Sequence, residues 1–208
     1  MIDRHVFIVD DSLKDATGLL LSLHAALLNS RDSGTDGPLS PDGVRLAFTH
    51  ICWDESTARQ GRAAFGEAEH EVRARVRAAG REAFPTEYVP VLLDAASGPE
   101  EQCGQVLEAQ ARLLLPFGDV RQAALLAMIL DPRTDVARLE EGKEVLSALL
   151  CRHYTAARCA VYTPYPTMSV CGAWKRAAGM EGEIIRWEYL ARPRALYLPL
   201  QRLLTDAL

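Results

Sequence analysis

Short apolar runs alternate with longer segments of helical periodicity along the whole chain, and this alternation restricts the fold more than any other feature of the sequence. The apolar runs predict six strands, at residues 5–9, 44–52, 88–95, 125–130, 157–162 and 183–187. Strands that alternate with helices at this spacing form an open, mainly parallel sheet with helices on both faces. The sequence therefore predicts a doubly wound α/β fold.

The chain of 208 residues is predicted to form a single domain, because no linker divides it and no repeat of fixed period is present. Residues 31–43 are nearly all turn and loop formers, which predicts an exposed loop. Residues 55–84 predict a long helix with a solvated face of alternating charge. Pro90 predicts that the third strand lies at an edge of the sheet, because proline cannot donate a ladder hydrogen bond.

Charge, apolar content and cysteine usage exclude several classes of protein. The 28 acidic and 23 basic residues leave a net charge of −5, whereas nucleic-acid binding requires an excess of positive charge. No apolar stretch reaches the roughly 18 residues of a membrane span, and the acidic N-terminus does not have the order of a signal peptide. The five cysteines form no CxxC pair, which is typical of reduced thiols. We therefore expect a cytoplasmic protein without a nucleic-acid or membrane partner.

Three residues at or just after the end of the second predicted strand are predicted to be structural rather than catalytic. His50 is interpreted as structural rather than catalytic. Cys52 has no histidine at an evident catalytic spacing, so it is not expected to be a nucleophile. Trp53 is assigned to the core or to an interface.

Acidic and hydroxyl side chains follow several predicted strands at the edge where sites form in doubly wound sheets. Asp10 and Asp11 end the first strand, Asp131 follows the fourth and Thr163 ends the fifth. Carboxylates that meet at one edge repel one another unless a cation holds them, and Mg²⁺ prefers such oxygen ligands. Thr163 can hydrogen-bond a phosphoryl oxygen, and Arg186 of the last strand can pair with it. The sequence therefore predicts a site for magnesium and a phosphoryl group.

The order of these positions resembles the receiver domain of two-component response regulators. The resemblance lies in the segments VFIVDDS, LLAMILDP, LEEGKEVLSALL, CAVYT and EIIR. It covers approximately residues 4–30 and 120–208, a little over half of the chain. The resemblance implies a flavodoxin-like arrangement of the sheet.

The resemblance also implies a role for each matching position. The Mg²⁺ ligands would be Asp10, Asp11, Asp131 and the backbone carbonyl of Arg133. Asp131 would in addition accept the phosphoryl group, and Thr163 and Arg186 would sense it.

The sequence departs from the receiver pattern in its spacing and in its basic position. Asp11 and Asp131 lie 120 residues apart, much farther than in receivers, so an inserted strand–helix unit is expected within about residues 44–120. None of the three lysines stands at the family's basic position, and Pro164 follows Thr163. These departures favour a degenerate phosphorylation site.

The leading interpretation is a receiver-like signalling domain without an output domain, which acts through a protein partner and for which Mg²⁺ is the expected cofactor. In a phosphorelay, that partner would be a histidine kinase or a downstream signalling protein. One alternative is a magnesium-dependent phosphohydrolase or nuclease-like enzyme that uses the acidic cluster. Another is a scaffold component that docks through residues 55–120. A role other than catalysis is favoured, and the oligomeric state stays open.

Overall fold

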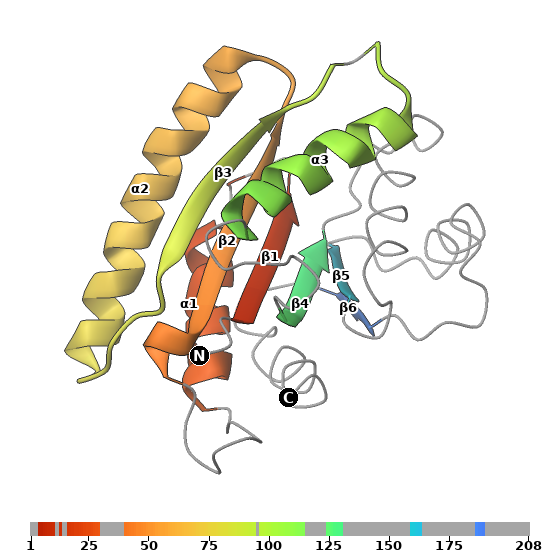
Figure 1. The fold of residues 1–208 in the computed structure, drawn as a ribbon. Coiled ribbons are helices and arrows are strands. Elements are labelled where there is room, and N and C mark those ends of the chain that lie inside the picture. Colours follow the sequence, from red (N-terminus) through yellow and green to blue (C-terminus); the bar gives the residue numbers. More distant parts are fainter. Residues whose placement is uncertain are drawn as a thin grey trace.

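The computed structural model describes residues 4–10, 13, 16–29, 40–94, 96–114, 124–130, 159–163 and 186–189. Its elements (Figure 1) are, in chain order, β1 (Arg4–Asp10), α1 (Ala16–Leu28), the 3₁₀ helix η1 (Pro41–Gly43), β2 (Val44–Cys52), α2 (Glu55–Ala78), β3 (Thr86–Leu92), α3 (Pro99–Leu114), β4 (Ala124–Leu130), β5 (Cys159–Thr163) and β6 (Arg186–Tyr189). The helices expected after β4 lie outside the described residues.

All six of these strands form one parallel sheet in the order β3-β2-β1-β4-β5-β6 (Figure 1). From β1 the chain builds outward to β3 at one edge and then returns to place β4 on the other side of β1. The strand order therefore reverses between β1 and β4, and in sheets of this kind ligands bind at such a switch point. The predicted parallel α/β sheet is confirmed.

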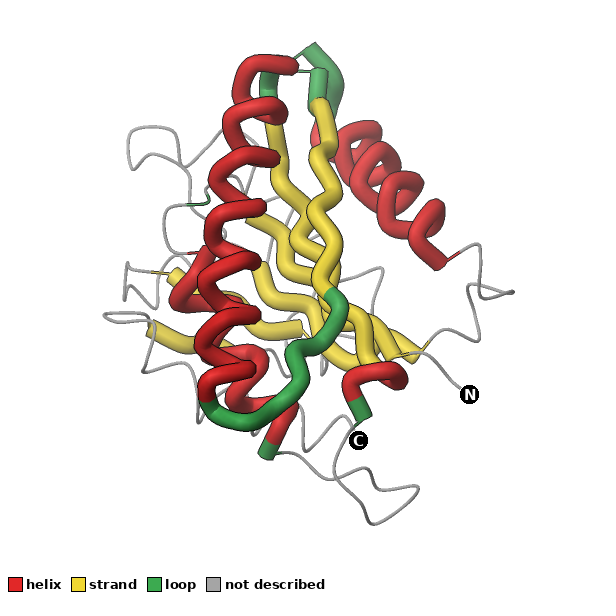
Figure 2. Tube along the Cα trace, turned by 90° about the vertical axis from the view of Figure 1, so that its left-hand side faces the viewer, coloured by secondary structure: helices red, strands yellow, loops and turns green. Residues whose placement is uncertain are grey.

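Helices cover both faces of the first half of the sheet. Side chains of β1 and β2 alternate between the faces, so Ile8 and Phe48 pack in the cluster that α1 and α2 complete. Thr49 points the other way, where its Oγ1 lies 3.5 Å from Gln110 Nε2 on α3. Figure 2 shows the sheet between α2 on one side and α3 on the other. The expected covering of the sheet on both faces is thus observed for this half.

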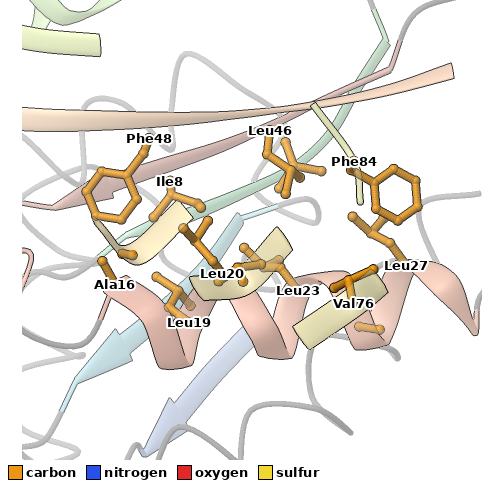
Figure 3. Close-up of a cluster of buried hydrophobic side chains, with 14 of the residues drawn as sticks. Ile8, Ala16, Leu19, Leu20, Leu23, Leu27, Leu46, Phe48, Val76 and Phe84 are labelled. Atoms are coloured by element: carbon orange, nitrogen blue, oxygen red, sulfur yellow. The ribbon is translucent and has the colours of Figure 1, made fainter. Parts of the chain in front are cut away.

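The main hydrophobic core lies between the sheet and the helices α1 and α2 (Figure 3). Leu20, Leu23 and Leu27 are fully buried along one face of α1, and each contributes about 1.5–3 kcal/mol through burial. The buried side chains of α2 recur at helical spacing and are Phe65, Ala68, Val72 and Val76.

Both ends of helix α2 are set by local sequence: a capping side chain precedes its first residue, and a glycine follows shortly after its last. Asp54 Oδ1 accepts the backbone N–H of Thr57 at 2.7 Å, a typical N-cap hydrogen bond. The helix stops at Ala78, and Gly80 follows with a φ of 71°, which favours glycine. This left-handed turn is why α2 is shorter than the helix predicted over residues 55–84.

Strand β3 lies at the edge of the sheet, as Pro90 predicts. Leu93 donates its backbone N–H to Cys52 O at 2.9 Å. Because alternate residues of a strand face the same neighbour, the nitrogen of Pro90 faces away from β2, where no ladder bond is lost.

The described end of the predicted loop 31–43 forms the short helix η1, in which Ser40 caps Asp42. Ser40 and Asp42 are exposed, and residues 31–39 lie outside the described part of the chain. Within the described residues, no helix combines the length and the apolar content that a bilayer crossing requires.

Candidate functional site

The carboxyl ends of β1 and β2 bring Asp10 beside His50. These two residues are register partners, so their side chains lie on the same face of the sheet, the one that α1 and α2 cover. Asp10 is 5% exposed and His50 is 3% exposed. On the other side of β1, Val9 pairs with Leu130 at the end of β4. Asp10 therefore stands at the switch point of the sheet.

The other predicted site residues are described only in part. Asp11, Asp131 and Arg133 lie outside the described residues. Thr163 is the last residue of β5 and is the register partner of Tyr189 on β6. The backbone thus places Thr163 at the carboxyl edge, as expected from the sequence.

Arg186 lies at the opposite end of its strand from this edge. The predicted strand over residues 183–187 is observed at Arg186–Tyr189, so Arg186 begins β6 and pairs with Ala160. It lies three positions before Tyr189, about 10 Å along a strand. The register therefore gives the carboxyl end of β6 to Tyr189 rather than to the arginine expected there.

A buried polar network adjoins Asp10 beneath the first half of α2. His50 Nδ1 lies 2.7 Å from Tyr88 Oη and 3.2 Å from Cys52 Sγ. Tyr88 Oη in turn donates to Ala58 O on α2 at 3.2 Å. This network, His50–Cys52–Tyr88, links β2, β3 and α2 at the carboxyl side of the sheet.

The network requires that α2 approach the sheet closely, and Gly61 allows this approach. A Cβ atom at Gly61 would overlap Tyr88 Oη and His50 Nδ1 and would lie 2.7 Å from His50 Cε1. Every larger residue would push the helix away from the imidazole and phenol groups. Tyr88 is further enclosed by the Phe65 ring at 5.2 Å and by the Arg62 guanidinium 5.5 Å above its ring.

Both acidic groups of the network are held in their protonated forms. Burial raises the pKa of the Cys52 thiol, although the hydrogen bond with Tyr88 opposes that rise. Burial also raises the pKa of Tyr88 to about 12, with Cys52 adding to the effect and Arg62 opposing it. Since a nucleophilic cysteine reacts as its thiolate, and Cys52 is fully buried, the network is a hydrogen-bonded scaffold rather than a nucleophilic centre.

The pairing of Cys52 with a histidine was missed from sequence, although a signal for it exists. His50 and Cys52 are two residues apart in a strand, and such residues share a face. The sequence was interpreted as showing no catalytic cysteine–histidine spacing at Cys52, whereas the structure places His50 Nδ1 3.2 Å from its Sγ. The exclusion of Cys52 as a nucleophile agrees with its burial. Tyr88 comes from another strand, so only the β2–β3 register could reveal it.

Of the four predicted magnesium ligands, the structure describes only Asp10. Among the residues that the structure describes, no group of three histidine, cysteine or acidic side chains is placed to hold a metal ion. The predicted set also needs Asp11, Asp131 and Arg133, which fall outside that part of the chain.

Comparisons with known proteins identify no family. No protein-family model matches the chain, and no curated protein matches it. Among solved structures, a short-chain dehydrogenase from Oenococcus oeni PSU-1 resembles the chain with a TM-score of 0.45 and 11% sequence identity. The similarity covers 99% of this chain and 92% of that one. At this level, the likeness says nothing of function.

Proposed function

We propose that this chain is a receiver-like signalling domain that binds Mg²⁺ with the acidic residues at the β1–β4 switch point and acts by binding a protein partner. The observation that carries the proposal is the pairing of β1 with β4 through Val9 and Leu130. Asp10 follows Val9, and Asp131 follows Leu130. The two aspartates thus follow, in the sequence, two residues that are register partners on neighbouring strands.

The strand order supports this proposal. When the edge strand β3 is set aside, the remaining order is β2-β1-β4-β5-β6, which is the 2-1-3-4-5 order of flavodoxin-like domains, receivers included. Strand β3 and its neighbouring helices fall within about residues 44–120, where the insertion is expected. The complete order is also that of dinucleotide-binding domains, but the segment DDSLKD after β1 contains no glycine to approach a pyrophosphate.

The proposed chemistry uses one carboxylate as acceptor and its neighbours as cation ligands. In an intact site, a carboxylate oxygen of Asp131 would attack the phosphorus of a phosphohistidine on the kinase partner, the P–N bond would break, and the released imidazole would take up a proton. In a degenerate site, which the missing lysine and Pro164 favour, this step would not occur and the domain would act by partner binding alone. Asp10 and Asp11 are the remaining carboxylate ligands. Magnesium, when bound, neutralises charge on the phosphoryl oxygens. Thr163 ends β5 at the same edge and is assigned the hydrogen bond to the phosphoryl group.

The test is a calorimetric titration of the full chain with Mg²⁺, for wild type and two variants. Asp10→Asn removes a proposed ligand, and Asp42→Asn makes the same change at an exposed residue of η1. We expect Asp10→Asn to weaken binding by at least about tenfold and Asp42→Asn to leave it unchanged. Equal Mg²⁺ affinity in all three proteins would show that the switch point is not the cation site.

A second titration tests the acceptor role. Beryllofluoride, a phosphoryl analogue, is expected to change the tryptophan fluorescence of wild type only when Mg²⁺ is present. Asp131→Asn should abolish that change. A signal that survives Asp131→Asn would overturn the assignment. Magnesium-dependent turnover of p-nitrophenyl phosphate that Asp10→Asn removes would replace the signalling role by the phosphohydrolase alternative.

A further inference from the structure

Two large apolar side chains are exposed at one corner of the sheet. Within the described part of the chain, Trp53 at 41% and Leu92 at 49% are the exposed large hydrophobic residues. Leu92 ends β3 and pairs in register with Cys52, the residue before Trp53. The N–H of Leu93 binds Cys52 O at 2.9 Å and joins the two strand ends. The register therefore brings the backbones of Trp53 and Leu92 to neighbouring strand ends, so both exposed side chains start from the same corner of the sheet.

Exposed carboxylates occur in the loops and first helical turns that follow these two strand ends. They are Asp54, Glu55, Asp94, Glu100 and Glu101. Gln102 of α3 donates to the backbone carbonyl of Asp94 at 3.1 Å, which ties the start of α3 to this place. We call Trp53, Leu92 and these five carboxylates the β2–β3 corner.

Three of the five arginines of α2, Arg73, Arg75 and Arg77, lie in its last two turns. The other two lie nearer its start, where Arg59 Nε donates to Glu55 O and Arg62 stands over the Tyr88 ring. The five carboxylates of the corner outnumber these two arginines. The helix dipole stabilises acidic residues at helix starts, but exposed carboxylates there still attract positive charge on an approaching molecule. A partner that covers the corner therefore gains from positive charge around its apolar contact.

The backbone of the corner is fixed before any partner binds. Asp54 caps α2 through Thr57 N, and Asp94 Oδ1 accepts Ala96 N at 2.8 Å. The His50–Cys52–Tyr88 network holds β2, β3 and α2 together directly below. A surface that is already ordered loses less conformational entropy on binding, and tryptophan is among the residues enriched at binding hot spots.

We propose that the β2–β3 corner docks a protein segment that presents large apolar side chains flanked by lysine or arginine. Trp53 and Leu92 would contact the apolar side chains, and the carboxylates of the corner would pair with the flanking cations. This proposal specifies the chemistry of the protein partner in the signalling role proposed above, and its biological meaning rests on that role. It does not rest on magnesium, because none of its residues is a proposed ligand.

The experiment measures fluorescence anisotropy of a labelled amphipathic peptide made of leucine and lysine, titrated with the full chain in magnesium-free buffer. A second peptide carries glutamate in place of every lysine. We expect the lysine peptide to bind and the glutamate peptide to bind at least about tenfold more weakly. Equal affinity for the two peptides would overturn the charge assignment, and no binding of the lysine peptide would overturn the surface itself.

Variants then locate the contact. Trp53→Ser combined with Leu92→Ser changes exposed side chains and should weaken lysine-peptide binding by at least about tenfold. Glu100→Lys should weaken it by about threefold, while Glu67→Lys, the same change at an exposed position in the middle of α2, should not. Circular dichroism spectra that match wild type show that the variants fold. Binding that all of these variants retain would place the contact elsewhere and refute the proposal.

Two further measurements separate this proposal from others. Asp10→Asn should bind the lysine peptide as wild type does, whatever it does to Mg²⁺ affinity, so the two proposals can fail independently. Sedimentation analysis measures the oligomeric state and so tests whether a second copy of this chain, rather than another protein, covers the corner. If Trp53→Ser with Leu92→Ser turns a dimer into a monomer and the lysine peptide does not bind, the corner is a self-association surface and the proposed partner is wrong.

Discussion

The two ends of α2 pack against the rest of the molecule in chemically different ways. Toward its C-terminal end, Val72 and Val76 join Leu23 and Phe84 in the hydrophobic core, where the only buried titratable side chain that the structure describes at this end is His24. Toward its start, Gly61 rests on the imidazole and phenol groups of the polar network. One helix therefore has an end held by apolar burial and an end held by a close fit over hydrogen-bonding groups.

The difference teaches where substitutions are tolerated. An apolar cluster accepts side chains of similar volume, because burial is non-directional. A hydrogen-bonded network accepts few changes, because a displaced partner leaves a buried polar atom unsatisfied. The polar end is also the end that carries the β2–β3 corner, so the part of α2 with the least freedom to vary is the part nearest both proposed sites.

The largest expected effect is at the apolar end. Leu23 is fully buried, and Leu23→Ala removes that burial and leaves a cavity between α1 and the sheet. We expect the free energy of unfolding to fall by about 3 kcal/mol, measured by urea denaturation. Leu23→Met keeps most of the volume and should cost less than about 1.5 kcal/mol. Equal losses of unfolding free energy in the two variants would mean that the shape of the Leu23 side chain, and not the volume it buries, determines the stability at this position.

The polar end predicts a smaller but more specific loss. Gly61→Ala places a methyl group against Tyr88 and His50, which forces α2 from the sheet. We expect a loss of about 2 kcal/mol in the free energy of unfolding. In a helix interior, alanine is otherwise favoured over glycine by about 1 kcal/mol, so the sign of the effect is itself informative.

Gly66 is the matched control, because it lies on the same helix and a Cβ atom added there would meet nothing within 4 Å. Gly66→Ala should raise the free energy of unfolding by about 0.5–1 kcal/mol, as measured by the same denaturation. Should Gly61→Ala also stabilise the protein, the close packing of α2 over the polar network would be disproved.

The fold was largely predictable because its signals are local. Residues 44–52 were predicted as a strand and form β2 without a change of bounds, since turn formers precede the run and Asp54 caps the helix after it. Pro90 was enough to place β3 at an edge. The last strand was predicted over residues 183–187, of which the structure describes 186 and 187 as part of β6, and the pairing with β5 continues to Tyr189, beyond the apolar run.

The candidate site was less predictable because it depends on register. The sequence identified Asp10 at the end of β1 and Thr163 at the end of β5. It placed Arg186 with them, but the observed pairing puts that residue beside Ala160. The contact of His50 with Tyr88 joins residues that are 38 positions apart, and no local pattern indicates it.

The smallest expected effect concerns the one buried histidine at the apolar end, His24. Its Nδ1 lies 2.7 Å from Leu20 O and its Nε2 lies 3.4 Å from Phe84 O. A neutral imidazole can donate to only one of these carbonyls, yet burial disfavours the charged form that could donate to both. Burial accordingly lowers the pKa of His24 from its ordinary 6.5, with the backbone hydrogen bonds opposing the shift.

This lowered pKa predicts how stability depends on pH. Below 6.5 the unfolded chain takes up a proton at this position before the folded protein does, so the free energy of unfolding falls as the pH drops toward the folded-state pKa. His24→Gln removes the titration and should flatten the decline between about pH 7 and pH 5. Urea denaturation at each pH decides: if His24→Gln keeps the wild-type slope, the decline comes from other groups, and the apolar end of α2 is insensitive to the one polar side chain buried beside it.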